Sequence, residues 1–293
     1  MTINFHREGS GPPLVLLHGI GHHWQAWRPV IDRLAGTFDV IACDLPGFGR
    51  SDPLAPDVEP TIAAYVDFLA RWLGELGLQR PHVAGNSMGG AIALELAARD
   101  AVASATALSP AGFWTPAERR WCQMTSLGLI AHLPKPLGPP VIRLAGTRLG
   151  RLALLAQLFD HPARIPSHEA AATLRDAIGA PAFRPALAAL GRYAPGPADL
   201  RATVPVTIAW GNHDWLLPRR LQAPRAQRML PDAQHVTLGA GHVPYFDDPA
   251  AVAAVIRSTA ASAHRCSAVG LRHTRFMQGR VRSRLPSPGR PPQ

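Results

Sequence analysis

The stretch HVAGNSMGGAI, residues 82–92, places Ser87 between glycines in the pattern Gly-x-Ser-x-Gly. The apolar run 81–84 is typical of a short buried strand, and segment 88–99, rich in small residues, is typical of a helix. A sharp turn between them would expose the Ser87 hydroxyl, while Gly85 and Gly89 avoid clashes beneath it. The same pattern also fits a glycine-rich turn without chemistry, so the rest of the chain must supply the partners that a serine nucleophile needs.

Strand and helix patterns alternate on both sides of this turn. Apolar runs at 13–17, 38–43 and 104–108 predict buried strands, and segments 24–34 and 61–76 have apolar residues at helical spacing. Strand patterns return from 204 and from 235, and a last helix begins near residue 249. This alternation predicts an α/β fold: a mostly parallel twisted sheet with helices on both faces.

Between residues 112 and 201 the alternation of strand and helix patterns stops. No strand pattern appears there, and apolar helical segments are separated by proline-rich turns such as HLPKPLGPP. We therefore predict a helical cap at 112–201, inserted into an α/β core formed by 1–111 and 202–262. Residues 263–293 lack periodicity and end in a Pro/Gly/Ser cluster, which predicts a disordered, arginine-rich tail.

The net charge of +10 belongs mainly to that tail. Residues 264–293 contain seven arginines and no acidic residue, which leaves +3 on residues 1–263. No aromatic or groove-reading pattern accompanies these arginines, so we expect no nucleic-acid partner. The start of the chain is too polar for a signal peptide and no apolar run is long enough to span a membrane, so we expect a cytoplasmic protein. Nothing in the sequence indicates the oligomeric state.

A base and an orienting acid for Ser87 are predicted at later strand ends. Asp214 lies in WGNHDWLLP, just after a buried strand, and His242 lies in GAGHVPYFDDP, after the last strand. Asp214 would hold the imidazole of His242 in one tautomer, and His242 would take the proton of Ser87. A loop Asp or His alone is usually a solvated or capping residue, but three such residues in the order Ser, Asp, His favour a catalytic triad.

The segment LLHGIGHHW follows the first buried strand and predicts an oxyanion hole. The backbone N–H groups of Ile20 and Met88 are its expected donors, and the Met88 N–H also lies at a helix N-terminus. His22 and His23 are interpreted as polar loop residues, because their spacing is not that of metal ligands. The three cysteines are far apart and indicate neither a metal site nor a disulfide framework. We expect neither metal nor cofactor.

Taken together, HG-x-G, DLPGFGRSD, GNSMGG, WGNHD and GHVPYFDDP resemble blocks of the α/β-hydrolase superfamily, in its capped serine-hydrolase branch. The resemblance covers about residues 3–262, although the usual first strand before INFHREGSG is short or missing and the tail lies outside the pattern. It implies a cofactor-free hydrolase with Ser87, Asp214 and His242 as its triad. A serine where dehalogenases and epoxide hydrolases carry aspartate argues against those two activities.

The resemblance leaves the type of reaction open. GNSMGG and the spacing from His18 to Trp27 are similar to those of meta-cleavage-product C–C hydrolases, in which the asparagine at the position of Asn86 lies near the substrate. Those enzymes typically carry tryptophan directly after the catalytic histidine, where this chain has Val243. Asn86 is equally well explained as a residue that stabilises the turn.

The main expectation is a serine hydrolase that cleaves a small to medium, largely apolar carboxylic ester through an acyl-enzyme. The alternatives are a C–C hydrolase of ring-cleavage dienoates and a non-catalytic ligand-binding protein of the same fold. An apolar roof over the substrate is expected from Phe113, Trp114, Trp121, Leu127, Leu129 and Ile130. The candidate substrate contacts are Asn86, Trp24, Phe113, Trp114, Trp121 and Val243.

Overall fold

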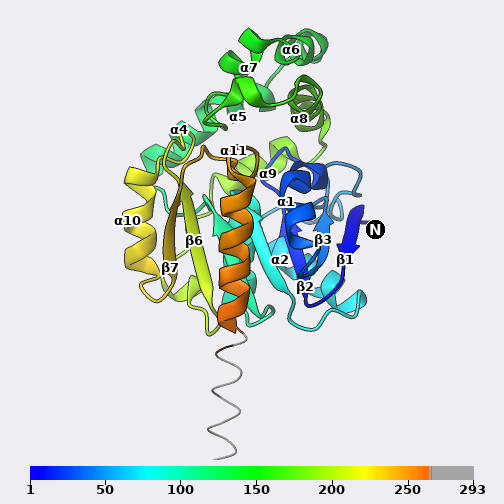
Figure 1. Cartoon of the computed structure of the whole chain (residues 1–293). Helices are drawn as coiled ribbons and strands as arrows, with labels where there is room; N and C mark the ends of the chain where they lie inside the picture. Colours follow the sequence, from blue (N-terminus) through cyan, green and yellow to red (C-terminus); the bar gives the residue numbers. More distant parts are fainter. Residues whose placement is uncertain (264, 266–293) are drawn as a thin grey trace, which may run out of the picture.

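The computed structural model describes residues 1–263 and 265, and a seven-stranded sheet runs through its centre (Figure 1). The strand order is β1-β3-β2-β4-β5-β6-β7, and every neighbouring pair is parallel except β1 and β3. The predicted mostly parallel α/β sheet is therefore confirmed. The strands are β1 (Phe5–Gly9), β2 (Pro13–Leu17), β3 (Asp39–Cys43), β4 (His82–Asn86), β5 (Ser104–Leu108), β6 (Val206–Gly211) and β7 (Gln234–Leu238).

Strand β2 shows why both faces of the sheet are covered. Leu14 and Leu16 pack into one hydrophobic cluster, whereas Val15 and Leu17 pack into another. Successive side chains of a strand point to opposite faces, so a continuous apolar run requires a helical layer on each side. Helices α2 (Ile62–Glu75), α3 (Met88–Ala98) and α10 (Arg219–Met229) contribute to the Val15 cluster, and α1 (Arg28–Leu34) and the helix of residues 249–263 contribute to the Leu14 cluster. Figure 1 shows the 249–263 helix (orange) across the near face of the sheet.

Two helices illustrate how local sequence sets their ends. The Thr61 side chain accepts a hydrogen bond from the Ala64 N–H and so caps α2, whose buried side chains are spaced at threes and fours. The predicted helix 24–34 is divided into a 3-10 turn, η1 (Trp24–Trp27), and α1. Pro29 lies in the first turn of α1, where its missing N–H would have no helical partner in any case.

The edge of the sheet was harder to predict than its centre. Residues 1–4 contain no strand, as expected, but β1 follows at once and pairs antiparallel with β3, with Phe5 opposite Cys43. Four of the five β1 residues are exposed, so this strand carries no apolar run that would reveal it.

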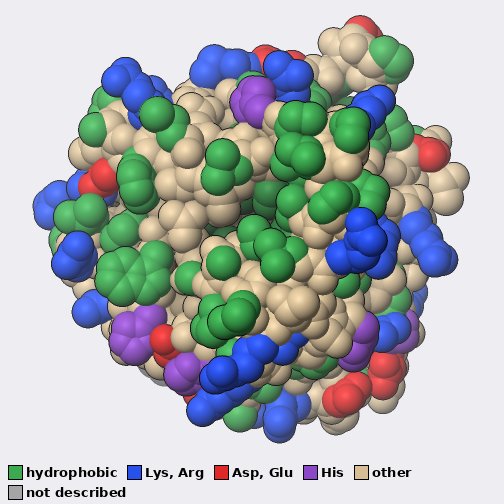
Figure 2. Space-filling model, turned by 90° about the horizontal axis from the view of Figure 1, so that it is seen from above, with side chains coloured by type: hydrophobic (Ala, Val, Ile, Leu, Met, Phe, Trp, Pro, Cys, Tyr) green, Lys and Arg blue, Asp and Glu red, His purple; other side chains and the backbone are tan. Residues whose placement is uncertain are grey.

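Helices only, with no strand, connect β5 to β6, and those of residues 126–179 lie beyond the carboxyl ends of the parallel strands (Figure 1, green). This is the segment for which we predict a cap. It comprises α4 (Pro116–Met124), α5 (Ser126–Ala131), η2 (Lys135–Leu137), α6 (Gly138–Ala145), α7 (Arg148–Leu154), η3 (Pro162–Arg164), α8 (Ser167–Gly179), α9 (Phe183–Leu190) and η4 (Ala198–Leu200). Seen from above, this side of the molecule carries many hydrophobic side chains (Figure 2).

None of the helices in residues 1–263 and 265 combines the length and hydrophobicity needed to cross a membrane. The predicted arginine-rich tail falls almost entirely outside the described residues.

Candidate active site

Ser87 occupies the single position between the end of β4 and the start of α3, with φ 55° and ψ −113°. A positive φ is costly for a residue with a side chain, and it turns the chain sharply from the strand into the helix. Gly85 and Gly89 make this turn possible: a Cβ on Gly85 would lie 2.0 Å from the Gly89 carbonyl oxygen, and one on Gly89 would lie 2.3 Å from that of Leu17. The strained strand–turn–helix geometry is that of a nucleophile elbow.

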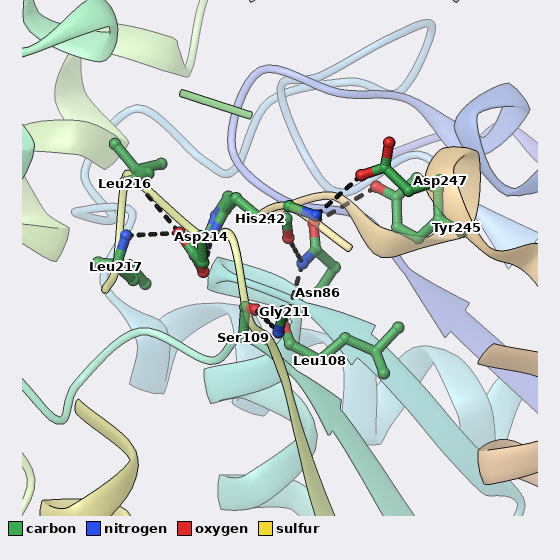
Figure 3. A network of polar contacts seen from close by, with 11 residues as sticks. Asn86, Leu108, Ser109, Gly211, Asp214, Leu216, Leu217, His242, Tyr245 and Asp247 are labelled. Carbon is green, nitrogen blue, oxygen red and sulfur yellow. Dashed lines mark hydrogen bonds and ion pairs between the residues drawn. The ribbon is translucent and has the colours of Figure 1, made fainter. Parts of the chain in front are cut away.

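His242 and Asp214 form a buried pair beside this turn, from the loops that follow β7 and β6 (Figure 3). The His242 Nδ1 lies 2.8 Å from the Asp214 Oδ2, and the Asp214 Oδ1 accepts hydrogen bonds from the N–H groups of Leu216 (3.0 Å) and Leu217 (2.7 Å). A carboxylate oxygen accepts hydrogen bonds, so the contact with the Asp214 Oδ2 assigns the proton to the His242 Nδ1. The His242 Nε2 is thereby left with its lone pair, as a general base requires.

Asn86 holds the backbone of His242. Its Nδ2 donates to the carbonyl oxygens of Leu108 (3.0 Å) and His242 (2.9 Å), and its Oδ1 accepts from the Tyr245 hydroxyl at 3.4 Å (Figure 3). Both amide protons of Asn86 are therefore used within the protein. The side chain is fully buried and joins the serine turn to the histidine loop.

Asp247, in α11 (Pro244–Asp247), ties the same loop to the cap. Its Oδ2 accepts from the N–H groups of Gly241 (2.9 Å) and Asp160 (3.0 Å), and its Oδ1 accepts from the His161 N–H at 3.1 Å. The Val243 N–H donates to the Leu158 carbonyl oxygen at 2.8 Å. Sequence reasoning missed this role, and its only signal was an acidic residue five positions after His242.

The two expected oxyanion donors belong to two segments next to the serine, the HGIG loop and the start of α3. Gly19 packs against the turn, since a Cβ there would lie 3.3 Å from the Ser87 Cβ, and Ile20 follows directly. The Ile20 N–H makes no hydrogen bond within the described part of the chain. Met88 is the first residue of α3, where backbone N–H groups have no intrahelical partner and the helix dipole favours negative charge.

Ser87 and His242 line one small cavity of about 30 Å³, which is space for roughly one or two water molecules. The wall is mostly aliphatic, with the phenyl ring of Phe183 and the imidazoles of His22 and His242 as its aromatic groups. It comprises Gly19, Ile20, Gly21, His22, Asn86, Leu127, Ile130, Leu158, Thr173, Leu174, Ala177, Phe183, Leu216 and Val243 besides Ser87 and His242.

The structure corrects the expected aromatic roof. Of the predicted substrate contacts, Asn86 and Val243 line the cavity, but four aromatic residues do not. Trp24 stacks on His6 with 4.6 Å between ring centroids, Phe113 packs edge-on against Trp210, the Trp114 indole donates to the Tyr193 carbonyl, and Trp121 is 56% exposed. Of the six roof residues, only Leu127 and Ile130 reach the cavity.

His22 was interpreted as a polar loop residue, yet it also lines the cavity, with its Nδ1 3.3 Å from the Tyr245 hydroxyl. Burial lowers the pKa of His22 to about 3 and that of the neighbouring His18 to about 4. Both imidazoles are therefore neutral near pH 7. The His18 Nε2 accepts from the Leu45 N–H at 2.9 Å, which fixes the HGIG loop on the sheet.

Comparison with known proteins places this geometry in a family. Over 210 residues the chain is 30% identical to an epoxide hydrolase of Mycobacterium tuberculosis, covering 67% of this chain and 93% of that protein. It superposes on an esterase from Thermogutta terrifontis with a TM-score of 0.69 at 24% identity, covering 89% of this chain and 94% of the other. A meta-cleavage product hydrolase from Pseudomonas fluorescens gives a TM-score of 0.69 at 20% identity, with 90% and 94% covered.

The family model for the alpha/beta hydrolase fold matches residues 12–249, a span that includes Ser87, Asp214 and His242. The chain therefore belongs to the α/β-hydrolase family.

Proposed function

We propose that the chain is a serine hydrolase that cleaves a small to medium, largely apolar carboxylic ester through an acyl-enzyme intermediate. One observation carries this proposal: the strained Ser87 and the Asp214-bound His242 line the same small, mostly apolar cavity. A serine hydroxyl attacks only when a base removes its proton, and His242 is the base within that cavity.

In the first half-reaction the Ser87 Oγ attacks the ester carbonyl carbon while the His242 Nε2 takes its proton. The carbonyl π electrons move to the oxygen, which the N–H groups of Ile20 and Met88 stabilise as an oxyanion. The intermediate collapses, the C–O bond to the alcohol breaks, and the His242 imidazolium protonates the leaving oxygen. The buried Asp214 carboxylate stabilises that imidazolium.

In the second half-reaction His242 removes a proton from water, and the hydroxide adds to the acyl carbon of the ester on Ser87. The same two amides hold the oxyanion. When the intermediate collapses, the Ser87 oxygen leaves and recovers its proton from His242, and the carboxylic acid product is released. The Ser87 proton thus leaves with the alcohol and a proton from water replaces it, so one ester and one water give one carboxylic acid and one alcohol.

Two related activities fit the site less well. A C–C hydrolase that uses the Asn86 amide on its substrate conflicts with the bonds of that amide, because both protons go to backbone carbonyls. The similarity to an epoxide hydrolase does not alter the proposal, since Ser87 supplies a hydroxyl that needs a base, not a carboxylate that attacks as it stands.

Replacing the nucleophile tests the proposal. We expect Ser87→Ala to lower kcat/KM for p-nitrophenyl butyrate by at least about 10³-fold, because residual rates come only from binding and oxyanion stabilisation. The exposed Ser258→Ala is the matched control and should retain wild-type kinetics. Wild-type turnover by Ser87→Ala, or loss of a dienoate chromophore without esterase activity, would refute the ester proposal.

A further inference from the structure

The cavity at Ser87 must open to admit any ester. Its volume of about 30 Å³ is far below that of ligand pockets, which are usually about 300–1,000 Å³. Water can reach such a space, but an acyl chain cannot. Part of the wall must therefore move before the substrate carbonyl can meet Ser87.

One wall residue, Leu216, also lines a second and larger hollow. This hollow, which we term the Trp121 groove, has a volume of about 360 Å³ and lies between α4 and α10. Its lining comprises Ala117, Glu118, Trp121, Leu216, Pro218, Leu221 and Gln222. Leu216 is 2% exposed and is the one residue that lines both the catalytic cavity and the groove.

The backbone of Leu216 is fixed by a hydrogen bond, whereas its side chain is held by packing in the hydrophobic core. The Leu216 and Leu217 N–H groups hold the Asp214 carboxylate (Figure 3). A rotation of the Leu216 side chain alone therefore leaves the Asp214–His242 pair in place. Side-chain rotations of this kind need no domain motion, in contrast to the opening of a whole cap.

The chemistry of the groove suits an apolar chain. Trp121 and Leu221 are exposed there, and Ala117, Leu216 and Pro218 complete a mostly apolar lining. The one acidic residue of the lining, Glu118, is paired with Arg225.

We propose that the Leu216 side chain is a gate and that the Trp121 groove binds the acyl chain of a medium-chain ester whose carbonyl lies at Ser87. This inference rests on the proposed esterase function and adds to it the substrate class. Each methylene that leaves water raises affinity about fourfold. The groove therefore selects linear acyl chains long enough to pass Leu216 over chains that end at the catalytic cavity.

The first test compares p-nitrophenyl octanoate with p-nitrophenyl acetate. We expect Leu216→Trp to lower the octanoate-to-acetate ratio of kcat/KM at least tenfold, and Trp121→Ala to lower it at least fourfold. Trp215→Ala is the matched control: Trp215 is 58% exposed, close to the 56% of Trp121, but it does not line the groove. Ratios for Leu216→Trp and Trp121→Ala within twofold of wild type would overturn the gate.

The second test measures ligand binding to the Trp121 groove in a protein that cannot turn the ligand over. A brominated octanoic acid methyl ester quenches a tryptophan that it touches, so it is added to the Ser87→Ala protein. We expect Trp121→Phe in that background to remove part of the quenching and Trp215→Phe to leave it unchanged. Equal quenching in both variants would contradict the groove assignment. If the wild type hydrolyses neither ester, the esterase proposal fails, and the quenching still decides whether the groove binds acyl chains.

Discussion

At the scale of single residues, the site depends on where each polar atom finds its partner. Asp214 uses one carboxylate oxygen for His242 and the other for two backbone N–H groups, so orientation and charge are set together. We expect Asp214→Asn to lower kcat by about 10³–10⁴-fold, because an amide facing Nδ1 favours the wrong imidazole tautomer. Steady-state ester kinetics measure the effect, and an unchanged melting temperature shows that the fold is intact. A loss below tenfold would contradict the assigned role.

Asn86 gives a second prediction at this scale. Its amide bonds to the Leu108 and His242 carbonyls mark it as a positioning residue that acts through His242. We expect Asn86→Ala to lower kcat about tenfold with KM within twofold of wild type, and to destabilise the fold by about 1–3 kcal/mol through two unsatisfied carbonyls. A KM that rises tenfold at unchanged kcat would instead make Asn86 a substrate contact.

At the scale of elements, α11 connects the cap to the histidine loop through Asp247. We expect Asp247→Asn to lower kcat and to speed hydrogen exchange at residues 158–161 and 241–243, because an amide group cannot accept from all three N–H donors. Asp248→Asn is the matched control, since Asp248 only caps the last helix through the Ala251 N–H. Equal exchange in the two variants would show that Asp247 does not hold the cap.

The same elements show what a single sequence reveals. A buried parallel strand requires its own apolar run, so the ends of the strands can be predicted from short stretches of sequence. The serine turn and the order of Ser87, Asp214 and His242 can then be placed at those strand ends. The residues of the cavity wall, in contrast, cannot be predicted from any one stretch of sequence. Three separate parts of the cap contribute wall residues, namely Leu158, Thr173 and Phe183. Tertiary packing leaves Trp121 exposed at the surface. Composition predicts that the wall is apolar but not which side chains form it.

At the scale of the whole molecule, buried histidines make stability depend on pH. Burial lowers the pKa values of His18 and His22 to about 4 and 3, whereas both are about 6.5 in an unfolded chain. Below pH 6.5 the unfolded state binds more protons, so folding stability is lost as pH falls towards the folded-state values. Between pH 7 and pH 5 each histidine removes about 2 kcal/mol from the free energy of unfolding.

Urea unfolding at pH 7 and pH 5 measures this loss. We expect His22→Gln to reduce the difference between the two pH values by about 2 kcal/mol relative to wild type, whatever its effect at pH 7. The exposed His168→Gln should leave the difference unchanged. An identical pH dependence in His22→Gln and wild type would mean that His22 is not held neutral by the fold.

In the proposed mechanism Ser87 is the nucleophile that His242 activates, and labelling with a fluorophosphonate followed by peptide mass spectrometry tests this assignment. We expect one label per chain on the peptide that carries Ser87, much slower labelling in His242→Ala, and none in Ser87→Ala. Labelling of another residue, or an unlabelled wild-type protein that still hydrolyses esters, would contradict it.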